Sequence, residues 1–263
     1  MAKKQERSRK KGKKKKSGLL SNLILILAVC VFVFSGYQLY QIFSEYHEGK
    51  KEYEEIRELV IQEEPNKETE EEKEPEVQPR FTVDFATLQQ MNPDTVGWIR
   101  FEEPSEISYP VVKGRDNEEY LTRTFEANDN KLGTLFVDKD NTGTFTDRNT
   151  IIYGHNMKNG TMFAKLLKFR EESFLKKHHV IILYTPKKTM HLKVISAYAV
   201  KAQDQMPITF ANEVQKKEYI TKIRRMSEPS IKLDDKKIDR IYTFVTCSYE
   251  RDDNRTYVHA VEE

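Results

Sequence analysis

The sequence predicts a mostly β protein: an eight-stranded, closed or nearly closed β-barrel with a few appended helices, preceded by a single transmembrane helix. Three observations support this fold class. Eight short runs rich in Val, Ile, Thr and aromatic residues follow residue 80, helical stretches are few, and one uncharged run lies near the N-terminus. Short strands of this kind are typical of all-β folds, so a two-sheet sandwich is the alternative to the barrel.

The eight predicted strands are bounded by Gly, Asn, Asp and Pro, which favour turns. They cover residues 95–101, 109–114, 133–138, 149–154, 179–185, 190–200, 240–247 and 256–261. Helices are predicted at residues 84–92, 117–125, 161–177 and 212–227. Between two of the strands, Pro186-Lys187-Lys188 predicts the tip of a hairpin.

The N-terminal part of the chain predicts a membrane anchor. Residues 1–16 hold ten Lys or Arg and one Glu, whereas residues 18–43 hold no charged residue. About 20 apolar residues cross a bilayer, and a basic flank stays on the cytoplasmic side. We therefore expect a cytoplasmic tail over 1–17 and a transmembrane anchor over 18–43, and no nucleic-acid partner. A cleaved signal peptide is the alternative, but no small-x-small site follows the apolar run.

A charged segment separates this anchor from the folded domain. Residues 45–64 place Tyr46, Tyr53, Ile56 and Val60 near helical spacing, which predicts a juxtamembrane helix. Residues 65–79 are rich in Pro and Glu and cannot build a core, which predicts a linker. We expect the helix and linker to occupy residues 44–79 and one folded domain to occupy residues 80–263.

The chain has two cysteines, Cys30 within the apolar run and Cys247 in the folded domain. Cysteines in these two positions cannot build a disulfide framework. An unpaired thiol outside the cytoplasm is either an inert buried residue or a reactive one. Composition alone leaves both interpretations open.

Two further residues could act with this thiol. If the strand that ends at Cys247 pairs with the next strand as a hairpin, Arg255 lies beside it, and a cation there favours a thiolate and can stabilise an oxyanion. Thiol chemistry also needs an imidazole to move protons. Among the five histidines of the domain, His155 directly follows a predicted strand, which places it at a rim. A plain strand-edge role is the alternative for Arg255.

Other chemistries lack their motifs in this sequence. No His-x-x-x-His, Cys-x-x-Cys or acidic cluster suggests a metal, and no Gly-rich loop suggests a bound nucleotide. The papain and caspase signatures around a catalytic cysteine are absent as well. We therefore expect no cofactor and no metal.

The order His155, Cys247, Arg255 resembles that of the sortases, membrane-anchored cysteine transpeptidases of Gram-positive bacteria. The run "TFVTC" is similar to the T-L-x-T-C strand end of that family, with Phe244 where Leu is usual, and "YGHN" resembles its histidine motif. Arg255 stands where the arginine of the family is expected. The resemblance extends from "VGWIRF" to the C-terminus and implies a sortase-type β-barrel.

Within this family the chain looks most like class B. The stretch "YGHNMKNGTMFAKL" and the long segment 201–239 with its own helix resemble that class, whereas the Asp-Pro-aromatic lid motif of class C is absent. By motif position, Asn117, Leu121 and Tyr153 correspond to residues that line the sorting-signal groove. The Thr-rich run "NTGTFTD" is a departure that does not touch the motifs.

The resemblance implies a reaction in two steps. Cys247 attacks the threonine carbonyl of a sorting signal on an exported surface protein, and an amine then opens the thioester. His155 moves the protons and Arg255 stabilises the oxyanion, whereas the aim of Asp252 and Asp253 cannot be deduced from the sequence. The implied acceptor is a lipid II-type cell-wall precursor or a pilin lysine, and the implied location is the cell membrane, with the catalytic domain outside. A peptidase that uses water and a non-catalytic, membrane-tethered binding domain are the alternatives.

Overall fold

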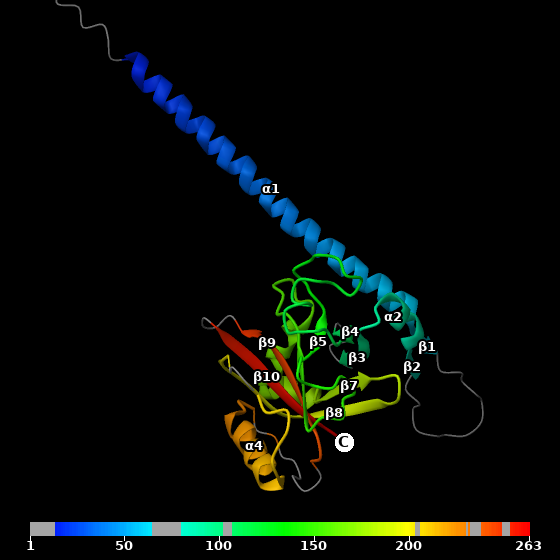
Figure 1. Ribbon diagram of the computed structural model, residues 1–263. Helices are drawn as coiled ribbons and strands as arrows, with labels where there is room; N and C mark the ends of the chain where they lie inside the picture. Colours follow the sequence, from blue (N-terminus) through cyan, green and yellow to red (C-terminus); the bar gives the residue numbers. More distant parts are fainter. Residues whose placement is uncertain are drawn as a thin grey trace, which may run out of the picture. The chain divides into compact units, whose positions relative to one another are not determined.

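Eight strands close into a barrel in the order β10-β8-β7-β3-β4-β5-β6-β9, with β9 paired back to β10 (Figure 1). The strands are β3 Thr95–Phe101, β4 Ser108–Val112, β5 Leu135–Val137, β6 Asn149–Tyr153, β7 Val180–Tyr184, β8 Thr189–Lys201, β9 Ile241–Ser248 and β10 Asn254–Glu262. The pairs β4–β5 and β6–β9 are parallel, and the other neighbours are antiparallel. Each predicted strand overlaps one of these eight, so the predicted barrel is confirmed.

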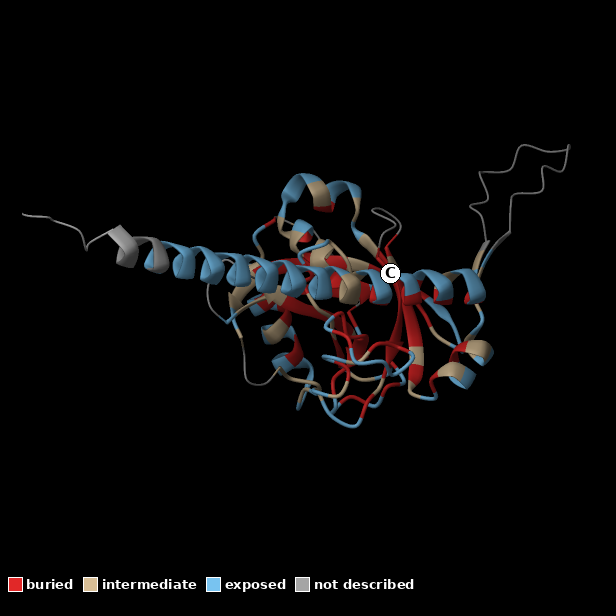
Figure 2. Cartoon of the chain, turned by 90° about the horizontal axis from the view of Figure 1, so that it is seen from above, coloured by how far each residue is buried: buried red, intermediate tan, exposed pale blue. Residues whose placement is uncertain are grey.

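The structure is a computed structural model that describes residues 14–64, 80–101, 107–202, 206–229, 231, 238–248 and 253–263. It divides into two compact units, Met1–Glu45 and Tyr46–Glu263. Helix α1 (Lys14–Val60) begins in the first unit, and its apolar residues between Leu20 and Phe43 are exposed (Figure 2). This helix is long and apolar enough to cross a membrane, and none of its most apolar window is buried.

Strand β9 alternates between the interior of the barrel and its outer face. In β9, Tyr242 and Phe244 belong to the main core, whereas Ile241 and Val245 belong to a second apolar cluster. Successive side chains of a strand face opposite sides of the sheet, so this period of two separates the inside from the outside. Cys247 continues the outward series of Ile241 and Val245.

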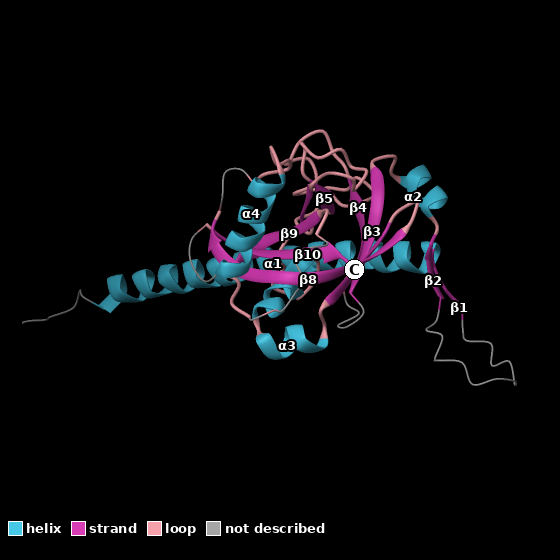
Figure 3. Ribbon diagram, turned by 90° about the horizontal axis from the view of Figure 1, so that it is seen from below, coloured by secondary structure: helices cyan, strands magenta, loops and turns pink. Residues whose placement is uncertain are grey.

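Helix α4 (Glu213–Met226) covers the outward face of the barrel next to β8, which it contacts (Figures 1 and 3). The side chain of Asn212 caps its first turn by accepting the backbone N–H of Gln215. Its Ile220 and Ile223 join outward-facing residues of β8, β9 and β10 in the second apolar cluster. The helix occupies the position predicted at residues 212–227.

The C-terminal part of α1 belongs to the barrel unit. Tyr53, Ile56 and Val60 recur at helical spacing and are buried in the main core. Two short strands, β1 (Ile61–Glu64) and β2 (Arg80–Val83), follow the helix and pair with each other. The compact unit therefore begins at Tyr46, whereas we expected the folded domain to begin near residue 80. The physical reason is that the apolar face of the helix is buried only by packing on the barrel. The expected linker at 65–79 lies outside the described residues.

One predicted helix is wrong. Helix α2 (Phe85–Met91) forms as expected, but residues 117–125 form a series of turns. There, Asp116 Oδ1 accepts hydrogen bonds from the backbone N–H groups of Glu118 and Glu119, at 2.9 and 2.8 Å. These bonds have the geometry of a helix N-cap, but the carbonyls of Tyr120 and Thr122 accept from the distant backbone N–H groups of Thr134 and Asn130 instead of from a helical turn.

The predicted helix at 161–177 is divided into two. The 3₁₀ helix η1 (Phe163–Arg170) comes first and α3 (Glu172–Lys177) follows. Glu171 between them has an extended backbone, with φ of −89° and ψ of 120°, which interrupts the helical hydrogen bonding.

A fully buried histidine, His259, lies on β10 where α4 covers the barrel. Its Nδ1 is 2.9 Å from the hydroxyl of Thr243, and its Nε2 is 3.1 Å from the hydroxyl of Tyr198. Because Thr243 donates its own proton to Asn149, its oxygen accepts the proton on Nδ1 and Nε2 accepts from Tyr198. Both ring nitrogens are thus paired in the neutral form, and burial lowers the pKa of His259 from 6.5 to about 3.

This burial predicts a loss of stability in mild acid. Between pH 6.5 and 3 the unfolded chain binds a proton on His259 that the folded chain does not bind. The free energy of unfolding should therefore fall with decreasing pH, by up to about 1.4 kcal/mol per pH unit from this group. Urea denaturation between pH 7.5 and 5 measures the slope. The variant His259→Gln should lose this pH dependence, whereas the exposed control His191→Gln should keep it. If the free energy of unfolding varies with pH equally in the wild type and both variants, His259 is not the source of the effect.

Candidate active site

The parallel pairing of β6 with β9 brings His155 and Cys247 to the same edge of the barrel. In this pair Tyr153 lies opposite Val245, and the backbone N–H of Gly154 donates to Val245 O at 3.1 Å. His155 and Cys247 are each two residues beyond that register pair. Parallel strands run in the same direction, so both residues lie next to each other where their strands end.

The antiparallel pairing of β9 with β10 adds Arg255 on the other side of the cysteine. Arg255 is the direct partner of Cys247 in this register, and the hairpin arrangement is seen in Figures 1 and 3. Neighbouring strands are about 4.8 Å apart. The histidine, the cysteine and the arginine therefore lie in one row across three adjacent strands.

The imidazole of His155 is held by the loop that precedes β5. Its Nε2 lies 2.5 Å from the carbonyl oxygen of Leu121, and a carbonyl can only accept, so Nε2 carries the proton. Nδ1 of the neutral ring is then the nitrogen that can accept a proton. Asn156 donates from Nδ2 to Cys247 O at 2.9 Å, which ties the histidine loop to the end of β9.

Two glycines, Gly154 and Gly133, allow neighbouring groups to pack closely around His155. A Cβ on Gly154 would lie 2.6 Å from the ring of Phe163, so only glycine fits between Tyr153 and His155. Gly133 has a φ of +60°, and a Cβ there would lie 2.5 Å from Tyr120 O and 3.1 Å from the His155 ring. The backbone of this loop thus packs directly against the imidazole.

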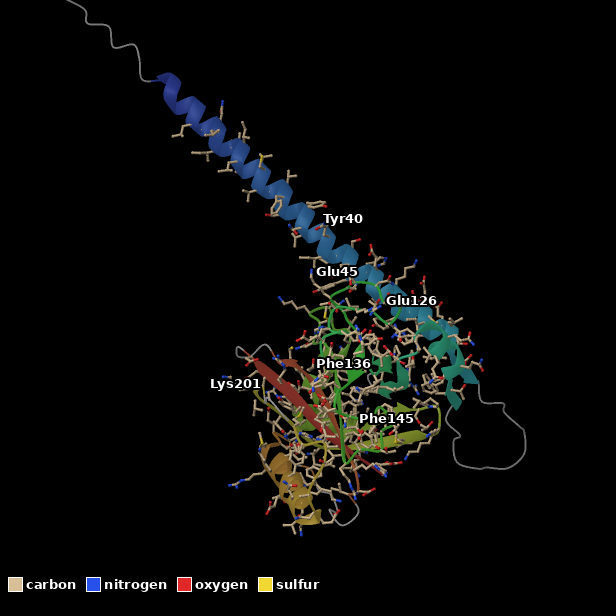
Figure 4. The ribbon with its side chains drawn as sticks, in the orientation of Figure 1. Tyr40, Glu45, Glu126, Phe136, Phe145 and Lys201 are labelled. Atoms are coloured by element: carbon tan, nitrogen blue, oxygen red, sulfur yellow. The ribbon has the colours of Figure 1, made fainter. Side chains whose placement is uncertain are left out.

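Helix α1 supports the same loop from the other side. Tyr53 donates its hydroxyl to Gly133 O at 2.5 Å. Glu52 accepts the backbone N–H of Glu126 at 3.0 Å and the side-chain amide of Asn128 at 3.1 Å (Figure 4 labels Glu126). The sequence alone does not indicate this support, because the residues involved are more than 70 positions apart in the chain.

A cavity of about 270 Å³ joins the row of three residues to the side chains expected to bind substrate. It is lined by Asn117, Leu121, Phe136, Tyr153, Gly154, His155, Val245, Thr246, Cys247 and Arg255. All six site residues expected from the sequence therefore line one cavity. Cys247 is half-buried within it, so its thiol is neither sealed in the core nor fully exposed.

One wall of the cavity rests on a buried carboxylate that the sequence analysis did not single out. Asp138 directly follows β5, and its Oδ2 accepts from the hydroxyl of Tyr153 and from Nδ2 of Asn117, both at 2.9 Å. Burial, followed by the charge of Asp138, raises the pKa of Tyr153, so its hydroxyl keeps its proton. The ring of Tyr153 packs on Phe136 of β5 at 5.3 Å (Phe136 is labelled in Figure 4).

Within the described residues, one carboxylate forms an ion pair with the row. Asp253 lies 3.7 Å from Arg255, whose Nη1 also donates to Asn254 O at 3.1 Å, and Asp252 lies outside the described residues. Within the described parts of the chain, no carboxylate forms an ion pair or hydrogen bond with His155. The same parts hold no group of three His, Cys, Asp or Glu side chains that could bind a metal.

Phe244, the departure from the usual strand-end motif, points into the barrel. It is fully buried, and its ring meets that of Phe163 edge to face at 6.1 Å. The phenylalanine that replaces the usual leucine therefore packs in the core, on the opposite face of β9 from Cys247.

The chain matches a family model described as the Sortase domain over residues 102–263, more than half of its length. The chain belongs to the sortase family. This sortase is 31% identical over 236 residues to sortase B of Listeria monocytogenes, with 89% of this chain and 92% of that protein covered. The resemblance to class B sortases is confirmed by this relative.

Solved structures give the same relationship. The crystal structure of Bacillus anthracis sortase B in complex with AAEK1 matches this sortase with a TM-score of 0.68 and 29% identity, covering 84% of this chain and 99% of that one. The Staphylococcus aureus sortase B–substrate complex matches with a TM-score of 0.63 and 29% identity, covering 68% and 84%. The barrel is therefore the sortase B fold.

The row of three residues predicts that this sortase depends on a guanidinium at position 255. Arg255→Lys keeps the charge but replaces a planar fork of donors with a compact ammonium. We expect kcat for cleavage of a sorting peptide to fall by about 10²–10³, the usual cost of losing one oxyanion donor. The control is Arg251→Lys, in the connection between β9 and β10, which should change the rate little. A large loss in the control with none in Arg255→Lys would contradict this assignment.

Proposed function

We propose that this sortase is a membrane-anchored transpeptidase that cleaves a sorting signal after threonine and joins the exported protein to an amine. The observation that carries the proposal is that His155 just after β6, Cys247 on β9 and Arg255 on β10 line one cavity. A thiol, an imidazole and a guanidinium supply the nucleophile, the proton carrier and the oxyanion donor that acyl transfer requires.

In the first half-reaction, the sulfur of Cys247 attacks the threonine carbonyl carbon of the bound peptide. The thiol proton passes to His155, and the carbonyl electrons form an oxyanion that Arg255 stabilises. The oxyanion then collapses and the carbon–nitrogen bond breaks. His155 gives its proton to the leaving amine, and a thioester remains on Cys247.

In the second half-reaction, an incoming amine attacks the thioester carbonyl. His155 removes the proton that the new bond releases, and Arg255 again stabilises the oxyanion. The carbon–sulfur bond breaks, the proton returns to the sulfur, and a new amide joins the threonine to the acceptor. We propose a cell-wall precursor or a pilin lysine as the source of this amine.

The cavity side chains Asn117, Leu121 and Tyr153 form the proposed sorting-signal groove. They line the same cavity as the cysteine, with a polar wall from Asn117 and Tyr153 and an apolar contact from Leu121. Staphylococcus aureus sortase B was crystallised with its substrate, which supports peptide binding by a barrel of this kind.

The N-terminal residues fit a single-pass anchor. Ten basic residues precede a long exposed apolar stretch of α1, and basic flanks remain in the cytoplasm. This orientation places the catalytic unit outside the membrane of a Gram-positive cell, where exported surface proteins pass.

The role of the nucleophile is tested by the two cysteines of the chain. In the full-length protein in detergent, Cys247→Ala should reduce cleavage of a sorting peptide and transfer to an added amine to background, because no other thiol lies in the cavity. Cys30→Ala is the matched control and should keep both activities. Undiminished transfer by Cys247→Ala would remove the proposal. Cleavage that an added amine neither accelerates nor diverts would favour a peptidase.

The orientation is tested by protease added to intact protoplasts. We expect digestion of the unit that begins at Tyr46 and protection of the basic tail, since the bilayer covers residues 18–43. An epitope at each end, read by immunoblot, measures the result. Recovery of a mature protein from the medium that starts after residue 43 would contradict an uncleaved anchor.

A further inference from the structure

We propose that Asp138 is a positioning residue that determines which groups of the sorting-signal groove donate and which accept hydrogen bonds. It holds Asn117 as a donor and the oxygen of Tyr153 as an acceptor toward the bound peptide. The inference rests on the proposed function, because it concerns how that same groove recognises an extended peptide. Asp138 itself does not line the cavity and acts through these two side chains.

The orientation of the Asn117 amide follows from its two partners. Its Oδ1 accepts the backbone N–H of Lys139 at 2.7 Å, and a backbone N–H can only donate. Its Nδ2 therefore faces Asp138, to which it donates at 2.9 Å. One N–H of the Nδ2 group remains for a ligand, so Asn117 offers a peptide a donor.

The polarity of Tyr153 follows in the same way. Its hydroxyl donates to Asp138 Oδ2 at 2.9 Å, which uses its single proton. The oxygen keeps lone pairs that can accept from a ligand. The packing of the ring on Phe136 of the neighbouring strand holds the side chain in this position.

Asp138 is suited to impose both orientations. It is only 7% exposed, and its backbone N–H donates to Ile151 O at 2.9 Å, which continues the pairing of β5 with β6. Its Oδ1 accepts the backbone N–H of Asp140 at 2.9 Å. A carboxylate accepts at both oxygens and donates at neither, so every group facing it must donate.

A donor and an acceptor on one wall match the two halves of a peptide group. A main-chain carbonyl of the sorting signal can accept from Asn117, and an N–H or hydroxyl of the signal can donate to Tyr153. A peptide bound in the reverse direction would present these groups in the wrong order. The groove therefore selects the direction of an extended peptide as well as its side chains.

The experiment compares Asp138→Asn with Asp140→Asn in the full-length protein. Asp140 is an adjacent, exposed carboxylate whose side chain pairs with Lys139 outside the cavity. Asp138 accepts from Asn117 and Tyr153 at Oδ2 and from the backbone N–H of Asp140 at Oδ1. An amide at 138 has one accepting oxygen and one donating nitrogen, so it cannot accept from all three donors at once. We expect KM for the sorting peptide to rise about tenfold or more in Asp138→Asn, since hydrogen bonds to charged groups are among the stronger ones. kcat should stay within about twofold.

A second readout separates positioning from general damage to the fold. A small thiol reagent needs no hydrogen bond from Asn117 or Tyr153, so the rate at which it modifies Cys247 should be unchanged in Asp138→Asn. In an Asn117→Ala, Tyr153→Phe background, Asp138→Asn should raise KM little further, because its partners are gone. A tenfold rise in that background, or an unchanged KM in the otherwise wild-type protein, would overturn the proposal.

Two further outcomes keep the test decisive. If Asp138→Asn fails to fold, Tyr153→Phe removes one hydroxyl alone, and an unchanged KM for that variant would overturn the proposal. If the wild-type protein and Asp140→Asn both fail to cleave sorting peptides while Cys247 still reacts with the thiol reagent, it is the proposed function that fails.

Discussion

The parallel hydrogen bonding between β6 and β9 is the constraint on which the rest of the site depends. These strands are about 90 residues apart in the chain, yet their register places His155 beside Cys247. A shift of one residue would turn every side chain of β9 to the opposite face and send the thiol into the barrel. Closure of the barrel through β9 and β10 prevents that shift, because Tyr242 and Phe244 are buried inside while Ile241 and Val245 pack outside.

The polar groups around this row are positioned by partners that have only one possible role. The carbonyl of Leu121 can only accept, so it fixes the proton on Nε2 of His155. The carboxylate of Asp138 likewise makes Tyr153 and Asn117 donate. Such preorganised dipoles need little rearrangement when charge develops on a substrate. The loop that carries Leu121 is in turn supported by α1, so the segment next to the apolar run takes part in shaping the site.

The strands were predictable from the sequence because their signal is local. Alternation of β-branched and aromatic residues sets β9 and β10, and their antiparallel pairing places Arg255 beside Cys247. The motifs at His155 and Cys247 then indicated the family. Asp138 escaped prediction because its role depends on side chains from two other segments. The false helix at 117–125 has the same cause, since its carbonyls at Tyr120 and Thr122 are paired with N–H groups of the later segment that holds Asn130 and Thr134.

In the proposed reaction Cys247 carries the acyl group between donor and acceptor, and intact-protein mass spectrometry can detect that intermediate. A sorting peptide is mixed with the full-length protein in the absence of an amine, and the reaction is quenched in acid. We expect a mass increase equal to the acyl fragment ending in threonine, located on Cys247 by peptide mapping and released by hydroxylamine. An acyl group on another residue, or peptide cleavage with no adduct on Cys247 at any time, would contradict it.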